Sequence, residues 1–454
     1  MDVAHPSPRQ RIAVVGCGHV GVVTAACFAE LGHTVTGVDI SSSRVADLNS
    51  GRVEFIEPGL DALLAENLAA GRLHFTTEHT KALTGARFIF LCVNTPATPS
   101  GAADLRYVRS AVAQIAAAIP VAAERPIIVN KSTSPIGTGE TIDAILTRHL
   151  ADAPAHPTIT ANPEFLRQGS AVQDFLHPDR IVVGAEHEED AALVAGLYDG
   201  IEAPVILTDL RTAEMIKYVS NAYLATRVSF VNEVARLCEP LGVNVETVIK
   251  GVSLDPRIGS AFFRPGIGYG GSCLPKDVAA LCHTGESFGV GMRLLTSVQD
   301  VNLNQRKHAV NSIRRILGPL EGLTIAAWGA TFKGESEDLR ESPAIDVIDL
   351  LRNEGAFIRV FDPALSPGDS VPFADDIAAD PLSAAQGADC VAVLTDWRQF
   401  RDIDPHALRS VMSGPLVYDG RNVLDRAAIE AAGLIYYGIG QAPTETRFTA
   451  GTAR

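Results

Sequence analysis

A cysteine beside a glycine-rich run is the first group in the sequence that could do covalent chemistry. Residues 268–277 read GYGGSCLPKD, so Cys273 stands between a run of glycines and a Pro-Lys-Asp sequence. A proline in this position is typical of the first turn of a helix. The positive end of a helix and the neighbouring Lys276 both favour a thiolate over a thiol. Glycines carry no side chains that would block a ligand. The pattern favours a nucleophile at Cys273, with a packed structural cysteine as the alternative.

A lysine and an asparagine four residues apart form the second candidate group. Lys217 and Asn221 lie in AEMIKYVSNAYLA, whose apolar spacing predicts a helix. Residues four apart share one helix face. A cation and an amide on an otherwise apolar stretch suit a pocket that stabilises an oxyanion. They also suit the exposed edge of a helix, and the pattern leaves both interpretations open.

The third group is a glycine pattern near the N-terminus. GCGHVG supplies Gly16, Gly18 and Gly21 between a predicted strand, RIAVV, and a predicted helix. In this context the glycines permit a tight turn, close approach of a pyrophosphate, and packing of helix on strand. Asp39 ends the next predicted strand, and its carboxylate suits a ribose 2′-hydroxyl and repels a 2′-phosphate. We therefore expect NAD rather than NADP, although the nearby Arg44 keeps NADP open, and a turn without a ligand is the alternative.

The elements that must position these groups follow a simple order. Short apolar runs alternate with helical patterns in the first half, which predicts a doubly wound α/β domain. A helix near 210–241 follows, and the helical pattern continues to about residue 318. Strand and helix patterns then return from LTIAAWGATFKG onward. We predict two Rossmann-like domains, at 9–207 and 319–454, joined by a long central helix and a helical middle section at 208–318.

Composition limits the class of protein. The chain has 454 residues and a formal net charge of −15, which argues against nucleic acid or an anionic membrane as a partner. No apolar run reaches the length of a membrane span, and the first ten residues lack the apolar core of a signal peptide. The seven cysteines show no metal-binding spacing, so we expect a reduced, cytoplasmic protein without a bound metal. Four of them lie in apolar runs and should be inert: Cys17, Cys27, Cys92 and Cys390.

Taken together, the motifs resemble those of the UDP-glucose/GDP-mannose dehydrogenase family over roughly residues 11–430. The resemblance rests on GCGHVG, FIEPGL, KSTSPIGT, NPEFL, AEMIKYVSNAYLA, DPRIG, GYGGSCLPKD, FKGESEDLRESPA and DGRN, in this order. It implies oxidation of the C6 alcohol of a nucleotide sugar to a carboxylate, with two NAD and no metal. It also implies a dinucleotide-binding N-terminal domain, a central domain that forms a homodimer or higher homo-oligomer, and a C-terminal domain that binds the nucleotide sugar.

The resemblance assigns the catalytic roles. The catalytic residues that it implies are Cys273, Lys217, Asn221, Glu164, Asp277 and Thr133. The Cys273 thiolate would attack an aldehyde to give a thiohemiacetal, whose oxidation gives a thioester. Lys217 and Asn221 would stabilise the sugar oxyanion, and acid–base roles for Lys217 stay open. Glu164 and Asp277 would order and activate the water that hydrolyses the thioester.

The resemblance also implies the binding residues. Those expected to contact NAD are Gly16, Gly18, His19, Val20, Gly21, Asp39, Arg44, Thr95, Thr133, Gln168, Lys276 and Arg340. Those expected to contact the nucleotide sugar are Glu164, Phe165, Leu166, Arg167, Gln168, Lys217, Asn221, Arg257, Arg264, Gly266, Gly268, Tyr269, Gly270, Phe332, Lys333 and Arg421. Arg257 would reach the sugar from the partner subunit, and the cations Lys333 and Arg421 would offset the diphosphate charge.

Some features leave alternatives. The family usually has Glu after NPEFLR, whereas this chain has Gln168, which cannot act as a base, so Glu164 must carry more of that role. GYGGSC favours UDP-glucose as substrate, with GDP-mannose, TDP-glucose and UDP-N-acetylhexosamine as alternatives. Two other functions are the alternatives to this reaction. A two-electron dehydrogenase would need no cysteine, and a non-catalytic NAD-binding scaffold would not need the full set of catalytic residues.

Overall fold

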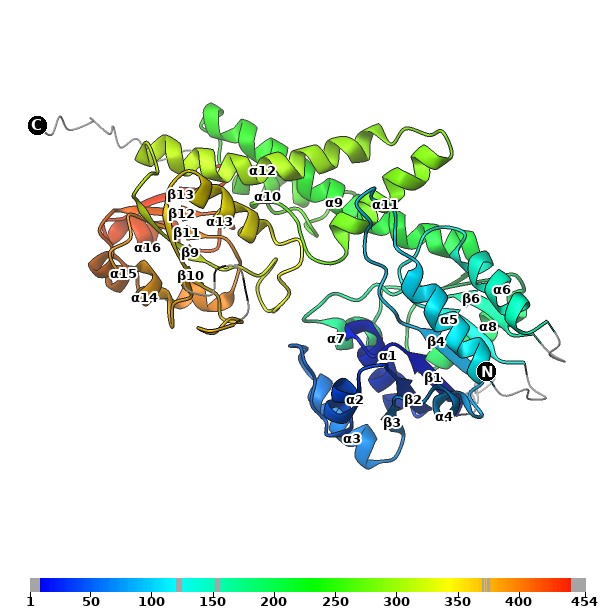
Figure 1. Cartoon of the computed structure of the whole chain (residues 1–454). Coiled ribbons are helices and arrows are strands. Elements are labelled where there is room, and N and C mark those ends of the chain that lie inside the picture. Colours follow the sequence, from blue (N-terminus) through cyan, green and yellow to red (C-terminus); the bar gives the residue numbers. More distant parts are fainter. Residues whose placement is uncertain are drawn as a thin grey trace, which may run out of the picture. The chain divides into compact units, whose positions relative to one another are not determined.

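The computed structural model describes residues 9–119, 125–151, 156–369, 371, 373 and 376–441 (Figure 1). The chain forms two compact units, the first of Met1–Ser220 with Ala279–Val290 and the second of Asn221–Val278 with Gly291–Arg454. Each unit contains one α/β sheet. The division at 9–207, 208–318 and 319–454 stays a prediction.

The first unit is built on an eight-stranded sheet in the order β3-β2-β1-β4-β5-β6-β7-β8. Neighbouring strands are parallel except β6 and β7, which are antiparallel. The strands are β1 Arg11–Val15, β2 Thr34–Val38, β3 Leu73–Thr76, β4 Phe88–Leu91, β5 Ile127–Asn130, β6 Thr158–Ala161, β7 Ile181–Ala185 and β8 Val205–Thr208. The two strands predicted around the glycine pattern are β1 and β2, and β4, β5 and β6 are further short apolar runs of the first half. The predicted parallel arrangement of these strands is confirmed.

Helices cover both faces of this sheet. Alternate residues of one strand enter different cores: Ile12 and Val14 pack in one cluster, and Ala13 and Val15 in another. The helices of the unit are α1 His19–Glu30, α2 Ser42–Asn49, α3 Leu60–Ala69, α4 His79–Leu83, α5 Arg106–Ala118, α6 Thr138–His149, α7 Ala171–Leu176 and α8 Glu188–Ala195. Burial on both faces explains the continuous apolar runs of the strands and confirms the doubly wound domain.

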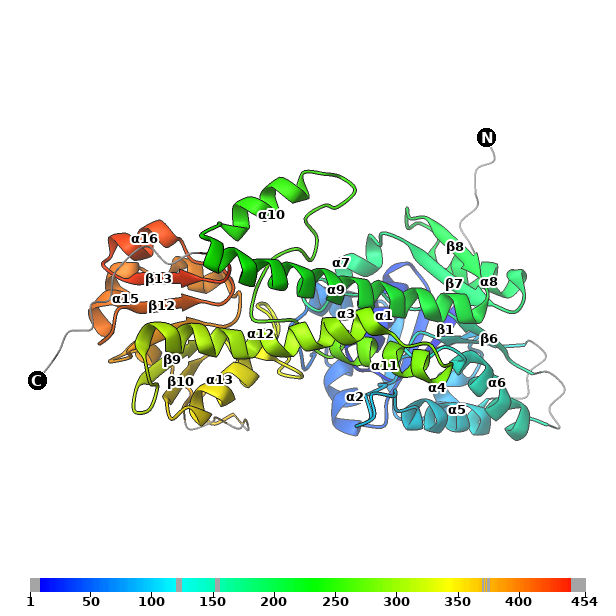
Figure 2. The same cartoon turned by 90° about the horizontal axis from the view of Figure 1, so that it is seen from above.

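The long helix α9, Leu210–Leu241, has the bounds that the sequence predicted, and Gly242 with φ of 67° follows it. Three further helices follow: α10 Val245–Ser253, α11 Leu274–Ser287 and α12 Arg293–Leu317. In the second unit α9 and α12 lie side by side (Figure 2), and the Ser229 hydroxyl donates to the Val298 carbonyl at 2.8 Å. Residues 254–273 contain no helix or strand. The middle section is therefore not all-helical as expected, because the glycines and prolines of this segment disfavour regular structure.

The second unit contains a five-stranded parallel sheet in the order β10-β9-β11-β12-β13. Its elements are β9 Thr324–Trp328, α13 Pro343–Asn353, β10 Phe357–Phe361, α14 Pro381–Ala385, β11 Cys390–Val393, α15 Pro405–Val411, β12 Leu416–Asp419, α16 Arg426–Ala431 and β13 Ile435–Gly438. The strand order reverses between β9 and β11, as it does between β1 and β4 in the first sheet. Ligands of such sheets bind at the carboxyl ends of the strands beside this reversal.

Candidate active site

The loop after β1 is shaped to receive a pyrophosphate. Gly16 has φ of 92°, and a Cβ there would lie 2.7 Å from the Cys92 carbonyl oxygen. A Cβ on Gly21 would lie 1.8 Å from the Gly16 carbonyl oxygen, so helix and turn need glycine at both positions. A Cβ on Gly18 would meet nothing within 4 Å. Gly18 precedes α1, whose N-terminus has no side-chain cap. The first N–H groups of α1 therefore suit an anion, and the loop fits a dinucleotide.

Asp39 follows β2 and is held beside this loop. Its carboxylate accepts hydrogen bonds from the backbone N–H groups of Cys17 at 2.8 Å and Ser41 at 2.9 Å. Arg44 lies 3.5 Å from Asp39 and 3.0 Å from Glu54. Two carboxylates thus compensate the Arg44 charge, which makes this arginine a poor partner for a 2′-phosphate. The setting favours NAD, in agreement with the sequence.

Glu57 of FIEPGL is a buried residue to which the sequence analysis gave no role. It lies 3.0 Å from His19 Nε2 at the start of α1. Its oxygens also accept hydrogen bonds from the backbone N–H groups of Gly169 at 2.9 Å and Ala171 at 2.7 Å. Glu57 therefore ties the dinucleotide loop to the chain that follows Gln168. A carboxylate within an apolar motif was the signal that could have identified it.

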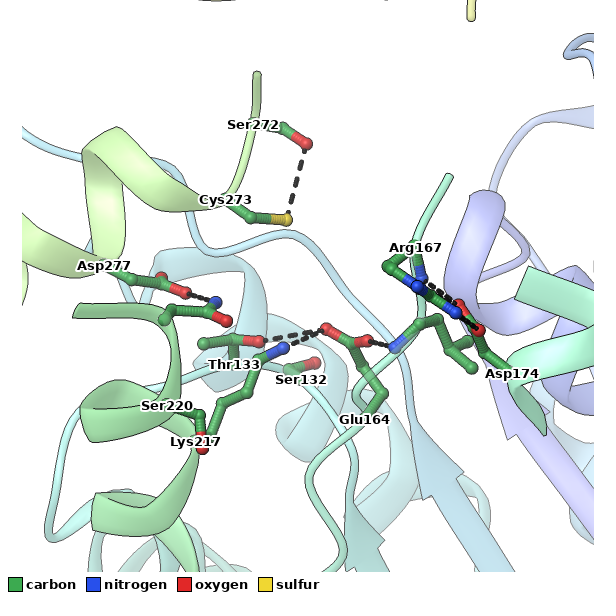
Figure 3. A network of polar contacts seen from close by, with 12 residues as sticks. Ser132, Thr133, Glu164, Arg167, Asp174, Lys217, Ser220, Ser272, Cys273 and Asp277 are labelled. Carbon is green, nitrogen blue, oxygen red and sulfur yellow. Dashed lines mark hydrogen bonds and ion pairs between the residues drawn. The ribbon is translucent and has the colours of Figure 1, made fainter. Parts of the chain in front are cut away.

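Lys217 and Glu164 form a buried ion pair in the first unit (Figure 3). Lys217 Nζ lies 3.0 Å from Glu164 Oε1, and the two side chains are 5% and 6% exposed. Thr133 donates to the same oxygen at 3.5 Å, and the Leu166 N–H donates to the other at 2.6 Å. Burial opposes ionisation of Glu164, but Lys217, the Leu166 N–H and Lys131 outweigh it, so the pKa of Glu164 is lowered. Lys217 is thus not on an exposed edge, and Glu164 is an ionised carboxylate.

Neighbouring residues fix this pair. The Thr95 hydroxyl donates to the Thr133 carbonyl at 2.5 Å, which joins the loops after β4 and β5. The Phe165 ring lies 5.4 Å from Lys217 Nζ and 3.8 Å from the Arg180 guanidinium. Arg167 instead turns to Asp174 and is exposed (Figure 3). The structure therefore groups Thr133, Glu164 and Lys217 but not Arg167.

Cys273 lies in the second unit, directly before α11, as the sequence predicted. It is exposed, and the other six cysteines of the chain are buried. The Ser272 hydroxyl lies 3.7 Å from its sulfur. Burial raises the pKa values of Cys27 and Cys92, the latter to about 12, so these thiols stay protonated. Cys273 is therefore the thiol that a substrate can reach.

Asn221 and Asp277 form a second buried pair. Asn221 Nδ2 donates to Asp277 Oδ2 at 2.6 Å, and Lys276 Nζ lies 2.6 Å from Asp277 Oδ1. Asp277 is one turn beyond Cys273 on α11, and its N–H donates to the Cys273 carbonyl at 3.0 Å. The amide, the carboxylate and the ammonium are thus fixed at the start of α11, where Figure 3 shows Asp277.

The glycines before Cys273 have a packing role that differs from the one expected. A Cβ on Gly270 would lie 2.1 Å from the Glu341 carbonyl oxygen, and one on Gly271 would lie 2.8 Å from the Phe332 ring. The segment's own close packing therefore requires glycine, in addition to any room left for a ligand. Asn302 on α12 holds Tyr269 through both its oxygen and its nitrogen, at 2.8 and 3.0 Å. Sequence reasoning missed this buried asparagine on a helix.

Arg421, after β12, binds three parts of the second unit together. Its guanidinium donates to the carbonyls of Leu394 at 2.8 Å, Phe332 at 3.3 Å and Gly268 at 3.4 Å. Burial lowers its pKa, against the attraction of Asp396 and other acidic groups, and it remains a cation. It thus joins the loop after β9 to the segment that leads to Cys273.

The remaining basic residues predicted to contact NAD or the nucleotide sugar contact other side chains or are exposed. Lys333 Nζ lies 5.6 Å from the Phe332 ring centre, and Arg340 pairs with Asp338 at 2.6 Å. Arg257 pairs with Asp255 at 2.6 Å and, like Arg264, is exposed. Within the described ranges, no cluster of three or more His, Cys, Asp or Glu side chains is arranged to hold a metal ion. The same residues include no helix with the length and apolar character of a membrane span.

The first unit carries a dinucleotide loop on its sheet, and the second unit carries an exposed cysteine and a buried arginine. These features define a nicotinamide-dependent oxidoreductase. Family models agree. The NAD binding domain of the UDP-glucose/GDP-mannose dehydrogenase family matches residues 10–202, its central domain 211–304 and its UDP binding domain 326–426. The chain belongs to this family, which confirms the resemblance and NAD as the cofactor.

Curated relatives and solved structures support the assignment. The chain is 41% identical to UDP-glucose 6-dehydrogenase YwqF of Bacillus subtilis over 95% of its length and 97% of the relative's. It is 39% identical to the UDP-glucose 6-dehydrogenase of Rhizobium meliloti over 95% of its own length and 99% of the relative's. A UDP-glucose dehydrogenase structure from Pyrobaculum islandicum has a TM-score of 0.88 at 38% identity, covering 97% of this chain and 100% of that one.

Proposed function

We propose that the protein oxidises UDP-glucose at C6 to UDP-glucuronate, consuming two NAD and one water and producing two NADH. Family membership and the names of the relatives support the substrate. The observation that carries the reaction type is Cys273, the one exposed thiol among seven, placed at the start of α11. A two-electron oxidation would have no use for it.

NAD, when bound, accepts the hydride in each oxidation. The groups that would hold it are the N–H groups at the start of α1, the Asp39 carboxylate and Thr95. For the diphosphate of the sugar nucleotide we propose Lys333 and Arg421. The guanidinium of Arg421 has five N–H donors, of which three serve carbonyl groups of the protein, so donors remain for a phosphate oxygen.

Cys273 provides the covalent step. Its thiolate attacks the C6 aldehyde carbon, so a C–S bond forms and the carbonyl oxygen becomes an oxyanion. Lys217 and Asn221, one turn apart on α9, stabilise this oxyanion by donating hydrogen bonds. Both are buried, and buried donors act more strongly than donors in water. Loss of hydride from the resulting thiohemiacetal leaves a thioester on Cys273.

Of the two carboxylates Glu164 and Asp277, Glu164 is the one that serves the hydrolysis. The lowered pKa of Glu164 keeps it able to accept a hydrogen bond from water, and Thr133 fixes its orientation. Asp277 already accepts from Asn221 and Lys276, so its role is to hold these two donors. The amide of Gln168 cannot take a proton. Glu164 is therefore the carboxylate to which we assign the water.

We also propose that α9 pairs with its copy in a homodimer. Large apolar side chains recur along its exposed face at spacings of four and seven residues: Met215, Val219, Tyr223, Phe230 and Leu237. A stripe with this spacing is typical of a helix that packs on another helix. Arg257 would then be available to the partner's site. Light scattering that shows a monomer at all concentrations would contradict the dimer.

A substrate panel tests the function. UDP-, TDP- and GDP-sugars are offered with NAD while NADH and the product mass are followed. We expect two NADH per UDP-glucose and a carboxylate product. One NADH per sugar with full activity of Cys273→Ala would indicate a simple dehydrogenase. Absence of NADH with every sugar would indicate a binding scaffold, and preference for GDP-mannose would correct the substrate alone.

A further inference from the structure

A small, partly open cavity lies next to Lys217 in the first unit. Asn130, Thr133, Glu214 and Lys217 are among the residues that line it. The centre of a water-sized sphere can move through about 10 Å³ of it. That is close to the space that one bound water needs, and such a water requires two or more polar partners. The lining supplies them.

Asn130 points to a ligand in this cavity. Its Nδ2 donates to the Ser134 hydroxyl at 2.7 Å. Its Oδ1 is buried and has no hydrogen-bond partner among the described residues. A buried polar atom without a partner is costly, and such atoms in native proteins usually contact ordered water. Asn130 itself is 3% exposed.

Glu214 is the second unusual group. It lies three residues before Lys217 on α9, and its carboxylate accepts from the N–H groups of Gly137 at 2.7 Å and Gly139 at 2.9 Å, at the start of α6. Burial raises the pKa of Glu214 to about 7, although these donors oppose the rise. Glu140 adds to it by repulsion. The other charged groups near Glu214 are Lys217, which lines the same cavity, and Arg211, which pairs with the exposed Glu140.

We propose that the cavity holds one water bridging Lys217 Nζ and the Glu214 carboxylate, and that Glu214 receives through it the proton released by the C6 hydroxyl. This inference rests on the proposed function. Lys217 gives a proton to the water, which passes one of its own to Glu214. The neutral amine then takes the hydroxyl proton as the hydride leaves C6. The net result is one proton moved from the C6 hydroxyl to Glu214, with Lys217 and the water restored.

The geometry gives reasons for this route. Lys217 is ion-paired with Glu164 and must lose a proton before it can accept one. An acceptor is most effective when it titrates near the working pH. Glu214 also lies near the exposed pair of Arg211 and Glu140, so solvent is close enough to take up its proton. If Glu214 served only to cap the N-terminus of α6, it would need neither the cavity nor Lys217 beside it.

The test compares Glu214→Gln with Glu140→Gln. The glutamine keeps an oxygen for the α6 N–H groups but cannot take a proton. Glu140→Gln removes a neighbouring exposed carboxylate as a matched control. Single-turnover NADH formation is followed by stopped flow across pH, and NAD affinity and Tm report whether the variants fold. An atomic-resolution crystal structure of the unmodified protein shows whether the water is present.

In the unmodified protein the rate should rise with pH through about 7, because Glu214 must be ionised to accept a proton. Glu214→Gln should lower the rate about a hundredfold and remove this inflection. Glu140→Gln should keep the rate and move the inflection to lower pH, because a repelling charge is gone. If Glu214→Gln does not fold, Asn130→Leu, which takes away the water's acceptor, should remove the same inflection.

An unchanged rate and inflection in a folded Glu214→Gln would overturn the proposal and leave Glu214 as a helix cap. A crystal structure without a water in contact with both Lys217 and Glu214 would overturn it too. If no nucleotide sugar is turned over, the proposed function fails and the proton transfer with it. The crystal structure would then still decide whether the bridging water exists.

Discussion

Lys131 is a fully buried lysine, and replacing it should change how stability depends on pH. Its Nζ donates to Asn162 Oδ1 at 3.1 Å and to the Tyr198 hydroxyl at 3.2 Å. The rings of Phe175 and Tyr198 lie 5.7 and 5.8 Å from it. Burial lowers the pKa of Lys131 to about 8, although the neighbouring Cys92 and Glu164 act to raise it. The buried charge of Lys131 therefore lowers the free energy of unfolding.

The size of the cost follows from the pKa. A fall from 10.5 to about 8 means that the charged side chain costs the folded state about 3 kcal/mol near pH 7. As pH rises through the folded pKa, the lysine loses its proton and the cost declines, to about 2 kcal/mol near pH 9. Because folding lowers the pKa of Lys131, the free energy of unfolding increases as the pH rises. Lys131→Met abolishes this gain, and its lost hydrogen bonds, about 1–3 kcal/mol each, shift stability equally at every pH.

Thermal unfolding of the two proteins across pH measures the effect. The Tm of Lys131→Met minus that of the unmodified protein should fall by about 2–4 °C between pH 7 and 9, because about 1 kcal/mol is involved. Lys81→Met, at an exposed lysine of the same unit, should show no such fall. Other titrating groups cancel in the difference. A Tm difference that stays constant with pH, or one that Lys81→Met reproduces, would refute the reasoning.

Further predictions concern catalysis and the cofactor. Cys273→Ser should keep NAD affinity but lower steady turnover about a thousandfold or more, since a hydroxyl is a far weaker nucleophile than a thiolate; native uronate formation would refute the covalent step. Glu164→Gln should slow thioester hydrolysis, so mass spectrometry should find a sugar adduct on Cys273 after a burst of NADH. Asp39→Asn should raise the use of NADP relative to NAD at least about tenfold in initial rates. Gly18→Ala should fold normally but bind NAD at least about tenfold more weakly in calorimetry. Gly21→Ala would place a Cβ 1.8 Å from a backbone oxygen, so it should lower the free energy of unfolding by about 3 kcal/mol or more in denaturation experiments.

The sequence predicted the fold where local pattern and burial agree. Strands such as β1, buried on both faces, read as apolar runs, and α9 reads as a helix over its whole length. The strands β7 and β8 were missed, although β7 is fully buried, because they extend a sheet whose antiparallel step has no local signal. The segment 254–273 lies within the predicted helical section but contains no helix or strand, because its glycines and prolines disfavour regular structure.

What the sequence alone determined is the chemistry: the glycine loop, Asp39, and the position of Cys273 before a helix follow from residue types and spacing. Only the tertiary structure decided which polar groups are buried and which of them meet. Lys217 could have been an exposed lysine until its 3.0 Å contact with Glu164 was seen. The roles of Glu57 and Glu214 could not be predicted, because each accepts from backbone N–H groups that are distant in the sequence; only the place of Glu57 in an apolar motif marked it as unusual. Burial and long-range pairing depend on how elements pack, and no local pattern encodes them.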